Sequence, residues 1–251
     1  MKKANKKANA AIVVIGNEIL SGRTQDANTS TLALWLNSLG VKIQEARIIP
    51  DIEEVIVKTI NKVRKKYKYV FTTGGIGPTH DDITARSISK AFNIKYEIHP
   101  QAFEILENYY KPGEFNKGRQ QMAWMPSNAR LILNPTSGAP GFAIENVFCL
   151  PGVPSILKSM LGGLKNEISG GKPILSHTIN LRTVESEIAA SLATVQKNNT
   201  EVEIGSYPFF KAGKVGVSIV MRTEEQSKID ICNSQILEFV NQKNIQIISE
   251  N

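Results

Sequence analysis

The fold of this chain is decided by residues 69–84, which read Tyr69-Val70-Phe71-Thr72-Thr73-Gly74-Gly75-Ile76-Gly77-Pro78-Thr79-His80-Asp81-Asp82-Ile83-Thr84. The apolar start is typical of a buried strand, and the glycines after it let backbone amides approach an anion closely. Two adjacent carboxylates beside such a loop can hold a divalent cation on that anion. The stretch therefore predicts a buried strand that ends in a site for a phosphate-bearing ligand and a metal.

Strand and helix patterns alternate on both sides of this stretch. Residues 10–15 and 147–150 are short continuous apolar runs, which are typical of parallel strands buried on both faces. We therefore predict an α/β fold in which residues 10–15, 69–73 and 147–150 are parallel central strands of a mostly parallel sheet with helices on both faces. A further strand is expected at 41–49, helices are expected near 32–39, 52–63, 84–92, 101–110 and 155–168, and a looser segment is expected at 111–146.

A linker is expected at residues 169–173, where Ser169 is followed by two glycines, a lysine and a proline. Residues 10–170 then form the main domain. Residues 171–251 show the order strand, helix, strand, strand, helix, strand, which predicts a smaller ferredoxin-like α+β domain. Residues 1–9 carry four lysines in the first seven positions and are predicted to be a disordered, dispensable basic tail.

Composition excludes several classes of protein. The 251 residues are 41% hydrophobic and 21% charged, and no apolar run approaches the ~20 residues needed to span a membrane. Cys149 and Cys232 lie in apolar contexts, so we expect buried free thiols, a cytoplasmic location and no membrane partner. The net charge of +7 includes a basic cluster at 62–68 with few interleaved aromatic residues. We interpret that cluster as solvated lysine surface and do not expect nucleic acid as a partner.

Polar residues follow three predicted strands at what must be one edge of the sheet, where ligands of open α/β sheets bind. Glu18 follows the first strand, Asp51 the second, and the glycine loop the third. Asp51 is also a good helix N-cap, with Glu54 three residues later as in a capping box, so a purely structural role stays open. Asp81 or Asp82 could cap the next helix in the same way. One cap needs only one carboxylate, so the pair favours function.

Together these motifs resemble the MoaB/Mog-type molybdopterin-binding family, and most of all the branch formed by the N-terminal domains of CinA and of eukaryotic FAD synthases. That branch carries a Gly-Ser-Tyr-Pro motif, which is matched here by residues 205–208. The resemblance runs through Gly16-Asn17-Glu18-Ile19-Leu20, Asn28, Pro50-Asp51, residues 74–84, Gly138-Ala139-Pro140-Gly141 and Leu150-Pro151-Gly152-Val153-Pro154.

The resemblance implies a three-layer α/β fold and an oligomer. For the broad family it implies molybdopterin binding, for the CinA branch a metal-dependent pyrophosphatase of ADP-ribose-like dinucleotides, and for the FAD synthase branch FAD hydrolysis. It assigns the functional aspartates to Asp51 and Asp82. CinA proteins commonly have Pro where His80 stands, and their amidohydrolase-like domain has no counterpart here, nor does an FAD synthetase module.

The leading hypothesis is a metal-dependent hydrolase of a nucleotide diphosphate bond that uses Mg, Mn or Co. The alternatives are a molybdopterin-binding or adenylylating protein, or a non-catalytic nucleotide-binding module. We expect a homo-oligomer, a dimer or trimer, with Tyr207 and Phe209 as apolar anchors. The candidate site comprises Asp51 and Asp82 as catalytic groups; Thr73, Gly74, Gly75, Gly77, Thr79 and Gly138 on phosphate; Glu18, Asp81 and Asp82 on metal; and Asn28, His80, Pro140 and Gly152 as pocket wall.

Overall fold

The computed structural model describes residues 8–250 except residue 212. It divides into two compact units, one ending at Gly171 and one beginning at Lys172. No helix in the described part of the chain is long and apolar enough to cross a membrane. Cys149 and Cys232 are free and buried, as predicted, and burial raises the pKa of the two thiols to about 12 and about 11, respectively.

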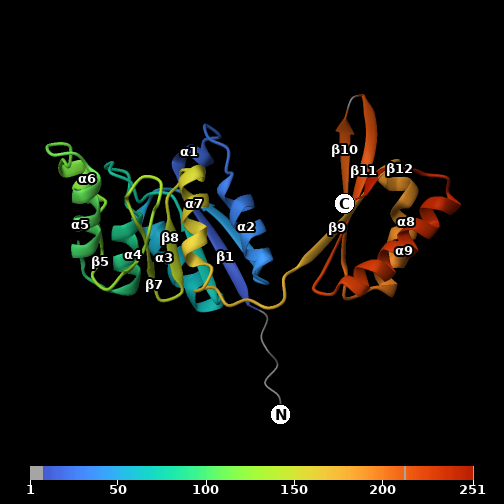
Figure 1. The fold of residues 1–251 in the computed structure, drawn as a ribbon, viewed down its shortest axis with the longest axis horizontal. Helices are drawn as coiled ribbons and strands as arrows, with labels where there is room; N and C mark the ends of the chain where they lie inside the picture. The colour runs from blue at the N-terminus through green and yellow to red at the C-terminus, as the bar shows by residue number, and fades with distance from the viewer. Residues whose placement is uncertain (1–7, 212, 251) are drawn as a thin grey trace, which may run out of the picture. The chain divides into compact units, whose positions relative to one another are not determined.

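The first unit is built on a six-stranded sheet with the strand order β2-β1-β3-β8-β7-β6 (Figure 1). The first four strands in this order pair in parallel, and β7 and β6 continue the sheet with antiparallel pairing. The predicted parallel arrangement of residues 10–15, 69–73 and 147–150 is therefore confirmed. The strands are β1 (Asn9–Ile15), β2 (Lys42–Ile49), β3 (Tyr69–Thr73), β6 (Arg130–Ile132), β7 (Gly141–Ile144) and β8 (Val147–Leu150).

Helices cover both faces of this sheet, which gives the predicted three layers (Figure 1). Side chains of β3 alternate between the faces, so Val70 packs with one helical layer and Phe71 with the other. Phe71 is fully buried and stacks on Phe148 with 5.0 Å between ring centroids. The first layer holds α3 (Glu53–Lys66), α4 (Thr84–Phe92) and α5 (Pro100–Tyr109), and the second holds α2 (Asn28–Ser38) and α7 (Pro154–Leu164).

The segment expected to be loose, 111–146, contains four short regular elements. α6 (Lys117–Gln121) and β5 (Trp124–Pro126) precede β6 and β7, and β5 pairs antiparallel with β4 (Tyr96–Ile98) in a separate two-stranded sheet. Strands of three or four residues are too short to show a period, and β5 pairs with a strand outside this segment. A further short helix missed by the sequence is α1 (Asn17–Leu20).

Two predicted boundaries were wrong. The expected tail of residues 1–9 includes Ala8, which is buried, and Asn9, which begins β1 and accepts a hydrogen bond from the Lys68 amide at 3.0 Å. Residues 1–7 lie outside the described residues. The helix expected at 155–168 ends at Leu164. Ile168 lies beyond the helix but packs on the same core, which is why the apolar pattern of the sequence continues past Leu164.

The second unit contains β9 (Leu175–Arg182), α8 (Glu185–Asn198), β10 (Glu203–Lys211), β11 (Lys214–Thr223), α9 (Gln226–Gln242) and β12 (Gln246–Glu250). Its sheet has the order β10-β11-β9-β12 with antiparallel pairing throughout. This is the predicted ferredoxin-like arrangement, in which both helices pack over the sheet around a core that includes Ile179, Ile188 and Ile236.

Gly74 is the tightest point at the end of β3. Its φ is +98°, and a Cβ placed there would overlap the carbonyl oxygen of Ile15. We expect Gly74→Ala to lower the free energy of unfolding by about 3 kcal/mol, because strain and steric overlap add. Gly113 also has a positive φ, +84°, but no atom lies within 4 Å of an added Cβ. Gly113→Ala is therefore the matched control and should cost only ~1 kcal/mol. Urea unfolding of both variants checks this, and equal losses would contradict it.

Candidate functional site

Loops that follow three strands meet at the carboxyl edge of the large sheet, held by backbone hydrogen bonds. The Gly16 amide donates to the Ile49 carbonyl at 3.1 Å, and the Gly74 amide donates to the Leu150 carbonyl at 3.1 Å. These bonds join the ends of β1 to β2 and of β3 to β8. The convergence expected from the sequence is therefore present in the structure.

The glycine loop turns back on the first residue of α4. Gly74 and Gly75 both have positive φ, and the Thr84 hydroxyl donates to the Gly74 carbonyl at 3.0 Å. The Thr84 amide donates to the Gly75 carbonyl at 2.9 Å, which fixes the turn from both sides. Within the described residues, the amides of Gly75, Ile76 and Gly77 have no hydrogen-bond acceptor. Successive free amides of this kind form an anion-binding concavity.

The two adjacent aspartates converge on Thr79. Its hydroxyl lies 2.6 Å from Asp81 Oδ1 and 2.5 Å from Asp82 Oδ2, and its amide donates to Asp82 Oδ2 at 2.8 Å. The hydrogen bond from Thr79 lowers the pKa of Asp81. Neither carboxylate caps α4, whose N-cap is Ile83 with no side-chain hydrogen bond. The capping alternative is therefore wrong for this pair.

Asp51 does not cap the helix that follows it, α3. The N-cap of α3 is Ile52, again without a side-chain hydrogen bond, so the capping-box interpretation of Asp51 and Glu54 was wrong. Instead, Asp51 Oδ2 accepts from the Asn17 amide at 2.8 Å and ties the loop after β2 to the loop after β1. Burial, and then the negative charges of Glu18 and Asp81, raise the pKa of Asp51. A half-buried carboxylate of raised pKa beside other acids is suited to accepting a proton.

The expected metal ligands form a pair of carboxylates with a third acid nearby. The Glu18 carboxylate folds back over Gly16, where an added Cβ would lie 2.6 Å from its Oε1. No three His, Cys, Asp or Glu residues in the described part of the chain form a group able to hold a metal ion. Mg²⁺ often binds through one or two carboxylates plus substrate phosphates, without a cage made wholly of protein. Asp81 and Asp82 fit that mode, because both carboxylates converge on Thr79 and Asp82 lies against Gly77.

Two of the expected ligand-facing residues have buried oxygens without a partner. Asn28 donates from Nδ2 to the Gly152 carbonyl at 2.7 Å, yet its Oδ1 and Thr73 Oγ1 have no hydrogen-bond partner among the residues that the structure describes. Buried polar atoms without a hydrogen bond are uncommon and are often explained by a ligand or water. Gly152 itself packs against Gly74: a Cβ added at Gly152 would lie 3.4 Å from the Gly74 Cα. Gly138 was expected to contact phosphate, but its nearest neighbour is the Tyr109 ring.

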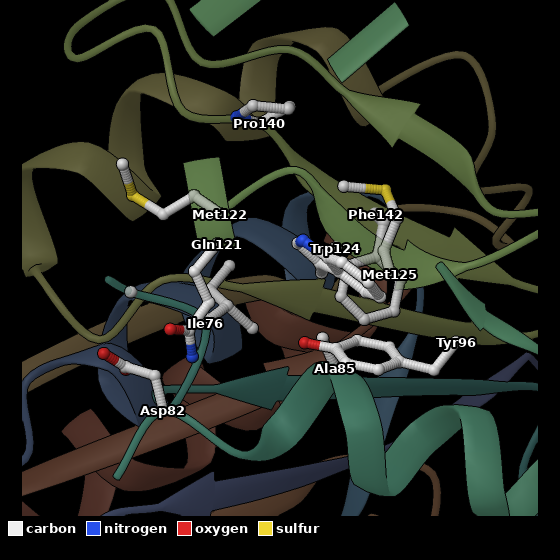
Figure 2. A pocket seen from close by; sticks show the side chains of 11 residues that line it. Ile76, Asp82, Ala85, Tyr96, Gln121, Met122, Trp124, Met125, Pro140 and Phe142 are labelled. Carbon is white, nitrogen blue, oxygen red and sulfur yellow. The ribbon is translucent and has the colours of Figure 1, made fainter. Parts of the chain in front are cut away.

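Of the four expected pocket residues, Pro140 and His80 line two adjoining hollows beside the loop, whereas Asn28 and Gly152 line neither of them. Figure 2 shows the smaller, where Pro140 lies on one side and Asp82 on the other. His80 lines the larger, a pocket of about 510 Å³. The sequence missed the wall residues that the two hollows share, because nothing in their spacing links them to the loop. These are Tyr96, Gln121 and Trp124.

Asp51→Asn should change stability with pH in a defined direction. A carboxyl whose pKa is higher in the folded protein than in the unfolded chain stabilises the fold while it is protonated. This contribution to the free energy of unfolding is lost as the pH rises through the folded-state pKa. Asn cannot ionise, and its Oδ1 can still accept from Asn17. At about pH 8 the variant should melt at or above the wild-type temperature, and the difference should disappear near pH 3, where Asp is protonated in both states. Calorimetry across this range checks the trend; a variant that is less stable only at high pH would contradict it.

Comparison with known proteins agrees with this geometry. Residues 11–177 match the family described as a probable molybdopterin binding domain, and residues 173–248 match the FAD synthase middle domain. A protein of Archaeoglobus fulgidus is 33% identical over 232 residues, which cover 92% of this chain and 98% of the relative. A protein of Aeropyrum pernix is 32% identical over 222 residues, which cover 84% and 82% of the two chains.

Among solved structures, a CinA protein of unknown function from Thermoplasma acidophilum superposes with a TM-score of 0.61 at 28% identity. The match covers 64% of this chain and 98% of that one. The family match and the relatives span the loops described above. The chain therefore belongs to the molybdopterin-binding domain family, and a domain of the FAD synthase middle-domain type follows its family domain.

Proposed function

We propose that this chain binds a phosphate-bearing nucleotide or pterin on its glycine loop and hydrolyses the diphosphate bond of a dinucleotide such as ADP-ribose or FAD. One observation carries the proposal: three consecutive amides without an acceptor, at Gly75, Ile76 and Gly77, lie beside the Asp81–Asp82 pair. The amides suit a phosphate, and the carboxylates suit a cation on that phosphate.

The carboxylates favour hydrolysis over binding alone. A loop that only holds a phosphate needs donors and gains nothing from acids, since like charges repel the ligand. Here Asp51 is close enough to Glu18 and Asp81 for their charges to raise its pKa. Several acids beside a phosphate site are explained if they activate a water molecule or hold a cation.

Each part of the site has a separate role in this proposal. The loop amides hold one phosphate and stabilise the charge that builds on it. Asp51 accepts a proton from the attacking water, and Asp82, fixed by Thr79, orients that water. A divalent cation, Mg, Mn or Co, bound by Asp81 and Asp82 together with phosphate oxygens, would neutralise charge on the leaving phosphate.

Asp82→Asn should separate chemistry from folding. The amide keeps an acceptor for Thr79 but loses the charge, so AMP release from FAD or ADP-ribose should fall by about a hundredfold or more. The melting temperature should move little, because Asp82 caps no helix. Turnover is measured with Mg²⁺, Mn²⁺ or Co²⁺ in turn.

Glu107→Gln is the matched control, because it removes a charge from an exposed position on α5 and should leave turnover unchanged. Wild-type hydrolysis in Asp82→Asn would refute the catalytic role. A large loss of stability with intact activity per folded molecule would assign Asp82 a structural role.

Molybdopterin binding or adenylylation is the second candidate, and the family match over residues 11–177 favours it. It uses the same loop amides on the pterin phosphate. If the wild type releases no AMP from FAD, ADP-ribose or NAD with any of the three metals but binds a pterin phosphate, this candidate or a non-catalytic binding module replaces hydrolysis.

We further propose a homo-oligomer, a dimer or trimer, in which apolar side chains of β10 and β11 contact a neighbouring copy. Tyr207 and Phe210 are 48% and 74% exposed, whereas the expected anchor Phe209 is only partly exposed because its ring lies over Gly216. Light scattering at micromolar concentration should give two or three times the mass of one chain. Phe210→Asp should shift the protein towards monomer, and a monomeric wild type would contradict the proposal.

A further inference from the structure

A pocket of about 510 Å³ lies beside the end of the glycine loop, where His80, Asp82 and Ile83 form part of its wall. It is lined by Asp82 and His80 at the loop end, by Arg86 and Lys117 on helices, and by Tyr96 and Trp124 on the two-stranded sheet. Its volume falls in the range of small-molecule sites. None of these residues except Asp82 and His80 was expected from the sequence to face a ligand.

One wall of the pocket is aromatic. Tyr96 pairs with Pro126, two residues beyond Trp124, so the two rings are diagonal neighbours on one face of the β4–β5 sheet. Their centroids lie 5.4 Å apart with the planes inclined at 45°. In Figure 2 the Tyr96 hydroxyl points towards the side of the hollow that holds Ile76 and Asp82. Trp124 remains 38% exposed, so a large apolar surface is available to a ligand.

The same pocket also carries two cationic side chains. Arg86 lies on α4 and pairs with Glu53 at 3.0 Å, and Lys117 at the start of α6 makes no ion pair with any described residue. The lining therefore combines a carboxylate of the glycine loop with cations and aromatic rings. That combination suits a molecule that carries both phosphates and a planar ring.

We infer that this pocket binds the planar nitrogen heterocycle of the ligand, stacked on Trp124, with Lys117 near its ribose or outer phosphate. The inference deepens the proposed function, because it rests on the phosphates occupying the glycine loop. It assigns Trp124 and Tyr96 as specificity-determining residues. Stacking on an aromatic side chain accepts any flat heterocycle, so the ring can be a purine, a pterin or a flavin.

The experiment compares Trp124→Ala with wild type, using AMP, FMN, a pterin monophosphate and inorganic pyrophosphate as calorimetric probes. The dissociation constant of the preferred heterocycle should rise by about tenfold or more, as loss of stacking predicts. The dissociation constant of pyrophosphate should stay within about twofold of the wild-type value, because pyrophosphate has no ring to stack and binds only the loop. The probe that is most affected identifies the ring. Trp124→Phe should restore most of the affinity.

Intrinsic fluorescence gives a second readout that does not depend on catalysis. The chain has two tryptophans, Trp35 and Trp124. Trp35 packs on Phe71 in the sheet core and lines neither hollow beside the loop, so Trp35→Phe isolates the Trp124 signal. At least one of AMP, FMN and the pterin monophosphate should quench that signal and pyrophosphate should not; the absence of quenching by all three would overturn the inference. The fluorescence test also decides the inference if Trp124→Ala does not fold.

The outcomes separate this inference from the proposed hydrolysis. Quenching of Trp124 by AMP in a protein that hydrolyses nothing supports the pocket and ends the hydrolase proposal. Hydrolysis with unchanged KM and kcat in Trp124→Ala, or equal losses for pyrophosphate and heterocycles, overturns the pocket and leaves the hydrolase proposal standing.

Discussion

The candidate site depends on how closely β3 ends between β1 and β8. The Gly74 amide donates to Leu150 on one side, and only the lack of a side chain lets Gly74 pass the Ile15 carbonyl on the other. With φ at +98° the chain turns sharply as it leaves the sheet. The amides of the next three residues therefore lie at the sheet edge without strand partners, where an anion can reach them.

A gathering of acids at one sheet edge costs free energy, and the surrounding structure offsets that cost with donors. Thr79 donates to both Asp81 and Asp82, and the Asn17 amide donates to Asp51. A hydrogen bond to a charged group is stronger than one between neutral groups. The carboxylates are thus held in place before any ligand binds, and burial, followed by the negative charges of Glu18 and Asp81, raises the pKa of Asp51.

The region that carries β4, β5 and α6 adds an aromatic and basic extension to this acidic edge. Its elements are short and pack beside α4, so the site gains a wall that the large sheet alone could not provide. A phosphate end built from backbone amides suits many ligands, because every phosphate presents similar oxygens. Discrimination between ligands must then come from the side chains of the extension, where ring size and charge differ.

The sequence by itself determined the parallel core, the ferredoxin-like second unit and the family, because short continuous apolar runs, the order of strand and helix patterns, and a dense glycine-aspartate motif are local signals. It also placed Glu18, Asp51 and the loop at one edge, since parallel strands share their carboxyl ends. Only the tertiary structure decided that the aspartates of these loops do not cap the helices that follow them, α3 and α4, and that Asp51 instead accepts from the Asn17 amide on another loop. It alone brought Tyr96 and Trp124 to the loop, because residues so far apart in sequence meet only through strand pairing and packing.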